Sequence, residues 1–253
     1  MPRKNLQIFQ AEHPSCCFCG GIRATATRDE VPPRSMFLGR RWPEGYQFPA
    51  CEICNASSRQ IDQLLALLSR LSFADHAYDQ EETVRMARGV ENNLPGFYPE
   101  PGFEEVEQET LDKLKLYQPA DSNDDIVSSR ISRDTLSSLH PFFRKLFCAL
   151  YYKHKRSILR AQAPVALVLS TNQILLADDP FSWQRIPGLD TLPPIRRGKH
   201  DLSRQFQYAW GTEADGRDFA FSFHLRFALF GLMIGPVPES RLSTLPPPIV
   251  ILR

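Results

Sequence analysis

The sequence contains no run of eighteen or more apolar residues, which argues against a membrane-spanning helix. Its first fifteen residues lack an apolar core followed by a small-residue cleavage site, so we expect no secretory signal peptide. Cysteine is also scarce, and six thiols in 253 residues are too few for a disulfide scaffold. These absences predict a cytoplasmic protein without a membrane partner, in a reducing compartment where cysteines bind metal.

The chain carries almost no net charge, because its formal value at pH 7 is +1. Such a balance indicates neither the presence nor the absence of a polyanionic partner, so any nucleic-acid surface must be a local patch. The hydrophobic fraction of 42% and the charged fraction of 23% are those of an ordinary globular protein. The length allows one large domain or two smaller ones with real cores.

The texture of the sequence predicts three parts. Residues 1–75 hold five of the six cysteines and open with few aliphatic side chains, which is typical of a module held together by metal. Residues 76–130 read as an acidic, helical connection, with a boundary or loop at the polar run 121–125. Residues 131–253 read as a helix packed on antiparallel strands. The predicted fold class is α+β, with an N-terminal four-cysteine, zinc-stabilised ββα finger followed by helices and a small antiparallel sheet.

Apolar side chains spaced three and four residues apart predict the helices. This spacing runs through residues 61–71 and most clearly through residues 132–157. Two further helices are expected over residues 81–92 and 103–117. Cys148 lies inside the longest predicted helix, far in sequence from the other cysteines, and is interpreted as a packed core thiol.

Alternation of period two predicts the strands. Residues 206–210 and 219–227 alternate on either side of the turn Asp215-Gly216, which indicates a β-hairpin. A short apolar strand is expected at residues 165–169, and residues 249–252 form either a last strand or an interaction tail. The polar face of the hairpin consists of Gln205, Gln207, His224 and Arg226. We expect this face to lie in solvent, with recognition of a partner as the alternative.

Two Cys-x-x-Cys turns supply the strongest motif in the chain. Cys16 and Cys19 form the first pair, and Cys51 and Cys54 form the second. Such a turn places two thiolates on one side of a tight loop, and four thiolates complete the tetrahedral shell of a structural Zn²⁺. Cys17 is an alternative to Cys16, although Cys16 gives the two-residue spacing. Unligated or redox-active cysteines are the competing interpretation.

The segment between the two pairs resembles the HNH (His-Me finger) endonucleases, and in particular a group of bacterial HNH-like proteins. Their pattern runs Cys-x-x-Cys-Gly, then Ala-Thr-x-Arg-Asp-His-Val-Pro-Pro, then Phe-Pro-Ala-Cys-x-x-Cys-Asn. The middle part stands here as Ala24-Thr25-Ala26-Thr27-Arg28-Asp29-Glu30-Val31-Pro32-Pro33, and the last part as Phe48-Pro49-Ala50-Cys51-Glu52-Ile53-Cys54-Asn55. The resemblance covers residues 14–72 and implies a zinc-stapled ββα core.

The resemblance also implies a catalytic centre. It assigns Asp29 and Asn55 to a divalent metal, Mg²⁺ or Mn²⁺, and it places Glu30 where the family has its general base. Imidazole accepts a proton near pH 7, whereas an unperturbed glutamate, with a pKa of about 4.3, is a weaker base. His13 and His76 flank the finger and are expected at the surface rather than as substitute bases.

Arginines are the candidate contacts to nucleic acid, because guanidinium groups bind phosphate bidentately. These arginines are Arg28, Arg34, Arg40 and Arg41. A solvated basic face is the competing interpretation. Trp42 and Tyr46 stand beside them and are expected either to stack on bases or to cover the cysteine pairs.

Three functions remain open from the sequence. The first is an HNH-like metal-dependent nuclease acting on DNA, impaired by a glutamate at the base position. The second is a non-catalytic zinc-finger protein that binds nucleic acid or a protein partner. The third is a zinc-stapled globular protein whose function lies in its C-terminal half.

Overall fold

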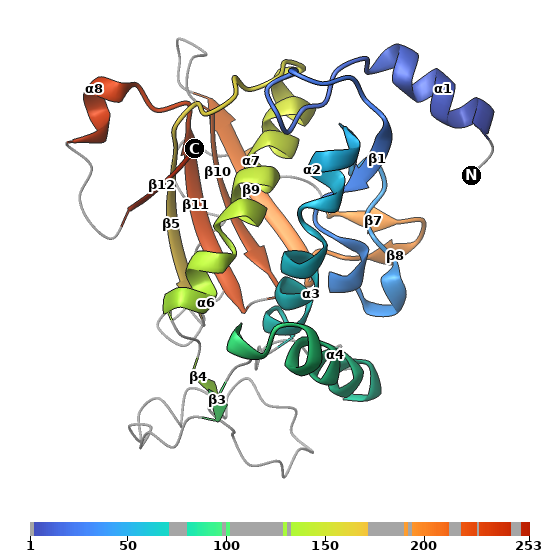
Figure 1. Cartoon of the computed structure of the whole chain (residues 1–253), viewed down its shortest axis with the longest axis vertical. Helices are drawn as coiled ribbons and strands as arrows, with labels where there is room; N and C mark the ends of the chain where they lie inside the picture. Colours follow the sequence, from blue (N-terminus) through green and yellow to red (C-terminus); the bar gives the residue numbers. More distant parts are fainter. Residues whose placement is uncertain are drawn as a thin grey trace.

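The computed structural model describes residues 3–70, 80–97, 100–101, 129–130, 133–171, 190–191, 194–212, 219–226, 228–243 and 249–253. Within these residues the chain has helices and antiparallel sheets, so the predicted α+β class is confirmed (Figure 1). No described helix is both long enough and apolar enough to cross a membrane.

The finger, residues 14–58, contains two short strands followed by a short helix. β1 (Thr27–Glu30) pairs antiparallel with β2 (Gln47–Ala50), in a register that sets Asp29 opposite Phe48. α2 (Glu52–Ala56) follows directly after β2 and completes the ββα order. Around the strands lie α1 (Arg3–Glu12) and the 3-10 turns η1 (Arg34–Met36) and η2 (Leu38–Arg40).

Two helices follow the finger where the apolar spacing predicts them. α3 (Arg59–Leu68) buries its leucines, and α4 (Gln80–Asn93) packs against α3. These two confirm the helices predicted over 61–71 and 81–92. After them come η3 (Pro95–Phe97) and the short pair of β3 (Glu100–Pro101) with β4 (Ser129–Arg130). The helix predicted over 103–117 and the boundary at 121–125 lie outside the described residues.

The longest predicted helix, over residues 132–157, is two helices in the structure. α6 (Arg133–Ser138) stops before Leu139, and α7 (His140–Lys155) begins with Pro141 in its first turn. Proline is favoured there because its missing N–H costs nothing at a helix start. Cys148 is 2% exposed inside α7, which confirms the packed core thiol.

A six-stranded antiparallel sheet forms the C-terminal half, in the order β12-β5-β11-β10-β9-β6. Its strands are β5 (Val165–Thr171), β6 (Asp190–Thr191), β9 (Phe206–Thr212), β10 (Phe219–Leu225), β11 (Leu229–Gly235) and β12 (Val250–Leu252). The predicted pairing of β9 with β10, the strand at 165–169 and the final strand are confirmed. The turn at Asp215-Gly216 lies outside the described residues. β7 (Arg196–Arg197), β8 (His200–Asp201) and α8 (Glu239–Leu242) complete this half.

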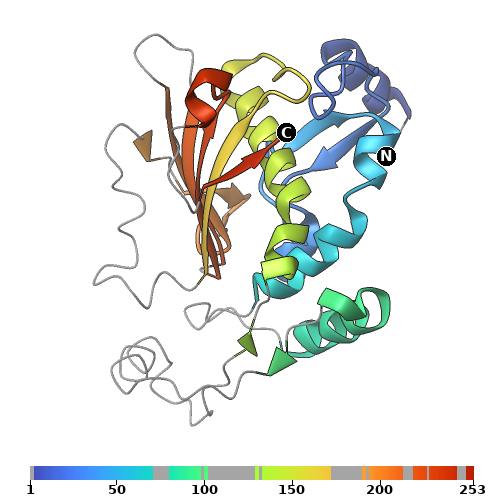
Figure 2. The same ribbon diagram turned by 60° about the vertical axis from the view of Figure 1, so that its left-hand side comes forward.

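Helix α7 lies between the sheet and the finger (Figure 2). The rings of Phe143 and Phe147 in α7 sit 5.7 Å from those of Phe223 and Phe221 in β10, centroid to centroid. Aromatic side chains bury large areas, so these contacts attach the helix firmly to the sheet. A continuous cluster of buried apolar residues extends from Cys17 in the finger to Leu252 in β12.

The predicted solvent exposure of the polar hairpin face is wrong. Exposure of its four residues is between 1% and 7%. Leu38 N–H donates to Gln205 Oε1 at 2.6 Å, and Arg226 Nη1 donates to the carbonyl oxygen of Met36 at 3.1 Å. The loop between the strands of the finger therefore packs on these side chains, and a buried backbone needs such hydrogen-bond partners.

Candidate metal centre and cationic surface

Four cysteines of the finger converge on one point. The sulfur atoms of Cys16, Cys19, Cys51 and Cys54 all lie within 4.8 Å of one another. Tetrahedral zinc with Zn–S bonds of about 2.3 Å requires sulfurs a little under 4 Å apart, so the set fits this ion with small adjustments. The structure thus assigns Cys16, and not Cys17, to the group, and the cluster can hold a structural zinc ion.

The protonation of these thiols depends on burial and on their neighbours. Burial raises the pKa of Cys16 and of Cys54 in the metal-free chain. Burial also acts to raise the pKa of Cys51, but hydrogen bonds from Cys54, Cys16 and Cys19 together outweigh it, so that this pKa is lowered. Zinc binds the thiolate form, so loading the site releases protons.

The first cysteine turn is built on glycine. Gly20 has φ +69°, and a Cβ added there would lie 2.3 Å from the backbone nitrogen of Ala161. Only glycine permits both this left-handed conformation and this close approach. The turn is thereby pressed against the segment that follows α7, which fixes the cluster relative to the helix.

The carboxylate of Asp29, a predicted metal ligand, is held by a lysine of α7. Lys145 Nζ lies 2.6 Å from Asp29 Oδ2, and both side chains are 7% exposed. Burial raises the pKa of Asp29, while the ammonium of Lys145 acts in the opposite direction. A lysine therefore supplies the positive charge that faces this carboxylate in the folded protein.

The same ammonium group connects Asp29 to a second carboxyl, which is partly buried. Lys145 Nζ donates to Ser58 Oγ at 2.6 Å, and Ser58 Oγ donates to Asp62 Oδ2 at 3.1 Å. Burial raises the pKa of Asp62 to about 6, although Lys145 opposes the shift. Lys145 therefore interacts with two carboxyl groups from different elements, directly with Asp29 and through Ser58 with Asp62.

The other two predicted catalytic residues do not share this position. Adjacent residues of a strand face opposite sides, so Glu30 points away from Asp29. The Glu30 carboxylate accepts hydrogen bonds from Arg34 and from Gln47 Nε2. Asn55 donates weakly through Nδ2 to Thr27 Oγ1, at 3.5 Å. Whether Asp29, Glu30 and Asn55 act in catalysis stays a prediction.

Within the described parts of the chain, the four cysteines are the only His, Cys, Asp and Glu side chains grouped closely enough to share a metal. No comparable set surrounds Asp29, whose nearest charged partner is already an ammonium group. This donor set does not support a catalytic Mg²⁺ or Mn²⁺. His13, one of the flanking histidines, shares a hydrogen bond of 2.8 Å with the hydroxyl of Tyr152, and His76 lies outside the described residues.

Lys145 is the functional residue that sequence reasoning missed. It stands three residues after Phe142 and four before Ala149, so it falls beside the apolar stripe of α7. A charged residue at such a position is rarely buried without a partner. The position of Lys145 beside the apolar stripe indicated that it is buried. Its partner could not be predicted, because Asp29 lies in a strand more than a hundred residues earlier.

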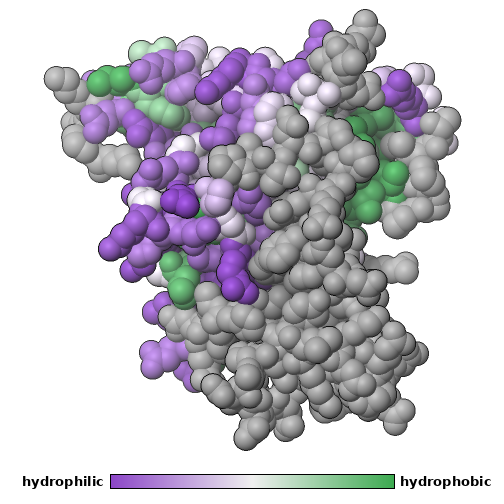
Figure 3. Space-filling view, turned by 180° about the vertical axis from the view of Figure 1, so that it is seen from behind, coloured by the Kyte–Doolittle hydropathy of each residue, from purple (hydrophilic) through white to green (hydrophobic). Residues whose placement is uncertain are grey.

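Cationic side chains gather around the loop of residues 42–45, which precedes β2. We call this the cationic surface, and its members are Arg28, Arg34, Arg41, Lys153 and Arg197. The surface combines three parts of the chain, namely the finger, the end of α7 and the β7–β8 hairpin. Seen from behind, hydrophilic side chains cover most of the described surface on the side of the finger and this hairpin (Figure 3).

Contacts with the loop hold these cations in place. The guanidinium carbons of Arg34 and Arg197 lie 3.6 and 4.5 Å from the centroid of the Trp42 ring. Lys153 Nζ donates to the carbonyl oxygen of Gly45 at 3.0 Å. Trp42 thus supports two arginines and does not cover the cysteines. Tyr46 does not cover them either, because it is buried against the sheet, where its hydroxyl meets that of Tyr208 at 3.2 Å.

The remaining cations lie at the rim of the same surface. Arg41 Nη1 is 3.3 Å from His200 Nε2, and the Arg28 guanidinium lies 4.4 Å from the Phe9 centroid. Two carboxylates, Glu30 and Glu44, lie among these five cations, so positive side chains outnumber negative ones in this set. Arg40, the fourth predicted contact, is exposed at the end of η2.

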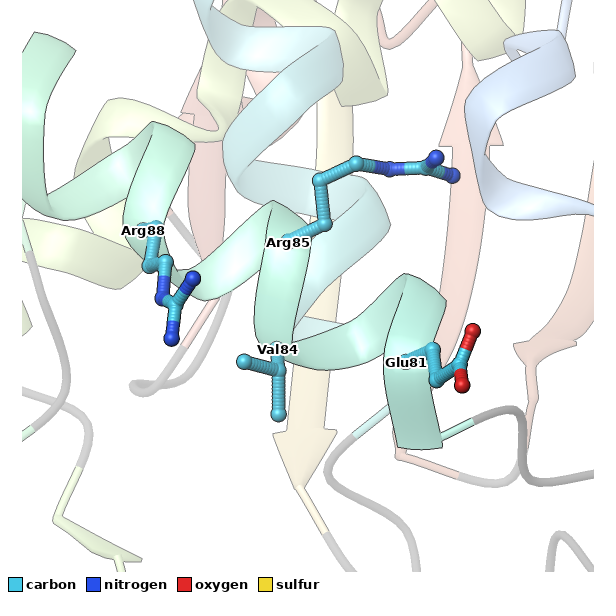
Figure 4. Close-up of a pocket in the computed structure, with 4 residues that line it drawn as sticks. All are labelled: Glu81, Val84, Arg85 and Arg88. Carbon is cyan, nitrogen blue, oxygen red and sulfur yellow. The ribbon is translucent and has the colours of Figure 1, made fainter.

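Two hollows that border the described residues differ in their lining. One of about 280 Å³ lies within the cationic surface and is lined by Phe9, Arg28, Trp42, Glu44, Gln47 and Arg197. The other, of about 530 Å³, runs along α4, and its four labelled side chains all come from that one helix (Figure 4). Among the described residues, the lining of the hollow on α4 comes from this one helix, and these four side chains alone do not converge from several elements as in a typical binding site.

No protein-family model, curated protein or solved structure matches this chain. The resemblance to HNH endonucleases therefore rests on residues 14–72 alone. A ββα order and a metal-compatible set of four cysteines are what the structure adds to it.

Proposed function

We propose that this protein binds DNA through the cationic surface and does not cleave it. Structural zinc in the four-cysteine cluster holds the finger in its binding conformation. The observation that carries the proposal is that three cations from separate parts of the chain, Arg34, Lys153 and Arg197, contact the loop of residues 42–45, with Arg28 and Arg41 at its rim.

Phosphate binding would explain why cations from distant parts of the chain lie together on this surface. Two arginines are held on one tryptophan ring, and a third rests on Phe9. Guanidinium groups fixed on aromatic rings lose less freedom when they bind phosphate. The chain as a whole is almost neutral, so attraction for a polyanion has to come from a local group of cations such as this one.

The ion pair of Lys145 with Asp29 supports binding without cleavage. Hydrolysis by one divalent metal needs an open carboxylate ligand and a base beside the scissile phosphate. Asp29 is buried and neutralised by an internal ammonium group, while Glu30 is engaged by Arg34. The nuclease implied by the resemblance stays a prediction, which a plasmid-cleavage assay tests.

The binding test uses fluorescence anisotropy with a labelled 20-base-pair DNA duplex over a range of salt concentrations. We expect affinity to fall steeply with salt, because phosphate contacts release counterions. Replacing Arg41 and Lys153 together with alanine should weaken binding about tenfold or more and make the salt dependence shallower by about one unit per lost contact.

Arg59→Ala is the matched control, since Arg59 is an exposed arginine of α3 outside the cationic surface. It should leave affinity almost unchanged. Binding that ignores salt, or that the control weakens as much as the double variant, would remove the proposal.

Cleavage is tested on supercoiled plasmid with Mg²⁺ or Mn²⁺. We expect no nicking by the native protein or by Glu30→His, because Lys145 still pairs with Asp29. Nicking by the native protein that disappears in Asp29→Asn would contradict the non-cleaving assignment. Nicking that appears only when Glu30→His is combined with Lys145→Met would identify the finger as a nuclease centre blocked by the lysine.

A further inference from the structure

The hollow in the cationic surface has the chemistry of a nucleotide site. Its walls come from α1, β1, the loop before β2, β2 itself and the β7–β8 hairpin. Elements that are distant in sequence thus place two guanidinium groups, a carboxylate and an amide around one space. Its volume, about 280 Å³, is close to the lower limit for small-molecule sites, which suits one nucleotide and not a base pair.

The two arginines of the hollow are held before any ligand binds. Arg28 rests on the Phe9 ring and donates to the carbonyl oxygen of Asn5. Its Nε atom is buried and has no hydrogen-bond partner among the described residues. Arg197 rests on Trp42 from the opposite part of the chain. An unsatisfied buried N–H is costly, and a phosphate oxygen is the acceptor that an arginine pair binds most strongly.

The remaining polar groups suit the edge of a base. Glu44 Oε1 accepts the N–H of Gly198 at 3.1 Å, which holds its carboxylate at the hollow. Gln47 donates through Nε2 to Glu30 and so keeps its amide oxygen as an acceptor. Carboxylate and amide oxygens accept hydrogen bonds from the N–H groups of bases, and guanidinium planes stack on base faces.

We propose that this hollow holds one unpaired nucleotide of the bound strand, with its phosphate on Arg28 and Arg197 and its base edge towards Glu44 and Gln47. This inference rests on the proposed DNA binding and gives it a preference for single-stranded or frayed segments. A paired base hides its Watson–Crick edge in the duplex, and only an unpaired base presents it.

The polymer test compares a labelled 12-nucleotide single strand with the duplex of the same sequence. We expect the native protein to bind the single strand about tenfold more tightly. Arg197→Ala should remove most of this preference by weakening the single strand selectively. Arg196→Ala is the matched control, because the neighbouring arginine of β7 is exposed and does not line the hollow. It should lower both affinities by similar, small factors.

The ligand test uses mononucleotides in calorimetric titration, with the 5′-monophosphates of deoxyadenosine, deoxyguanosine, deoxycytidine and thymidine compared with their nucleosides and with inorganic phosphate. We expect a monophosphate to bind the native protein more tightly than either fragment, and Arg197→Ala to weaken it about tenfold. Arg28→Ala, checked for zinc content, should act in the same direction.

The outcomes separate the two proposals. Equal losses on single strand and duplex in Arg197→Ala, with no mononucleotide binding, would overturn the nucleotide site and leave DNA binding intact. Mononucleotide binding that needs Arg197, in a protein that binds neither polymer, would retain the site and overturn DNA binding. Binding of phosphate alone as tightly as a nucleotide would overturn the base contact.

Discussion

Lys145 is a buried cation shared by two carboxyl groups of the finger and its following helix. The ammonium group meets Asp29 directly and Asp62 through Ser58. Burying such charges is expensive, and the cost is offset only when each charge keeps its partner. At the residue scale the pair is therefore a specific connection between α7 and β1, and removal of one member should be far more harmful than removal of both.

Replacement of Lys145 by methionine tests this connection. It leaves Asp29 as an unpaired buried carboxyl, so we expect the free energy of unfolding at pH 7.5 to fall by about 3–5 kcal/mol. The combined change Lys145→Met with Asp29→Asn should recover most of the loss. Urea denaturation followed by circular dichroism measures both, and a single variant as stable as the native protein would contradict the role given to the pair.

The pH dependence of this variant has a defined sign. Burial already raises the pKa of Asp29, and loss of Lys145 raises it further. A carboxyl whose pKa is higher in the folded than in the unfolded chain binds more protons when folded, so stability increases as pH falls towards the unfolded value. The deficit of Lys145→Met should therefore shrink between pH 7.5 and pH 5.5.

The finger is an element whose own apolar core is small. Two four-residue strands and a five-residue helix cannot hold each other in place, because isolated strands and short helices are marginal in water. The four cysteines join the first turn to the start of α2, so that a metal would close the loop containing β1 and β2. At the scale of the element, zinc should decide whether the finger is folded.

We expect one zinc ion per chain by elemental analysis, and its removal by a chelator should unfold the finger, since zinc binding contributes about 10 kcal/mol or more in such sites. Cys54→Ser should lose most of the metal and lower the melting temperature. Cys148→Ser serves as the control, because this buried thiol lies in α7 outside the cluster. Full zinc content in Cys54→Ser would refute the assignment.

At the scale of the whole molecule, the finger and the sheet share one core. The continuous cluster of buried side chains runs through α3 and α7 to the last strand, and the hydrogen bonds of Gln205 and Arg226 attach the finger loop to the sheet. The division at residues 75 and 130 stays a prediction. Because the finger and the sheet share a core, we do not expect the first part to fold independently.

If the finger and the sheet unfold as one cooperative unit, two different signals of unfolding should change together. We expect zinc release, followed with a chromogenic chelator, and loss of sheet structure, followed by circular dichroism, to have the same midpoint on heating. Phe143→Ala on the sheet side of α7 should lower both midpoints together by several degrees, because it removes a buried ring. Ile22→Ala, at a residue 71% exposed, is the control and should change neither. Two separate midpoints in the native protein would argue for independent domains.

The sequence alone determined the cysteine cluster and many of the described helices and strands, because these features depend on short-range patterns. Several features depend only on residues that are close together in the chain. These are the two Cys-x-x-Cys turns, the apolar spacing of α3 and α7, and the alternation of β9 and β10. The cysteine cluster and the α+β class follow from such patterns, since coordination spacing and helical or strand period are short-range properties.

Only the tertiary structure decided what the buried polar groups do. Lys145 meets Asp29, and Gln205 meets the backbone of Leu38, across more than a hundred residues of sequence. Period two placed Gln205 and Arg226 opposite the aromatic face of the sheet, but it did not reveal that the loop of the finger contacts these two side chains. Burial of a polar side chain depends on which distant element packs on it, and no local pattern encodes that choice.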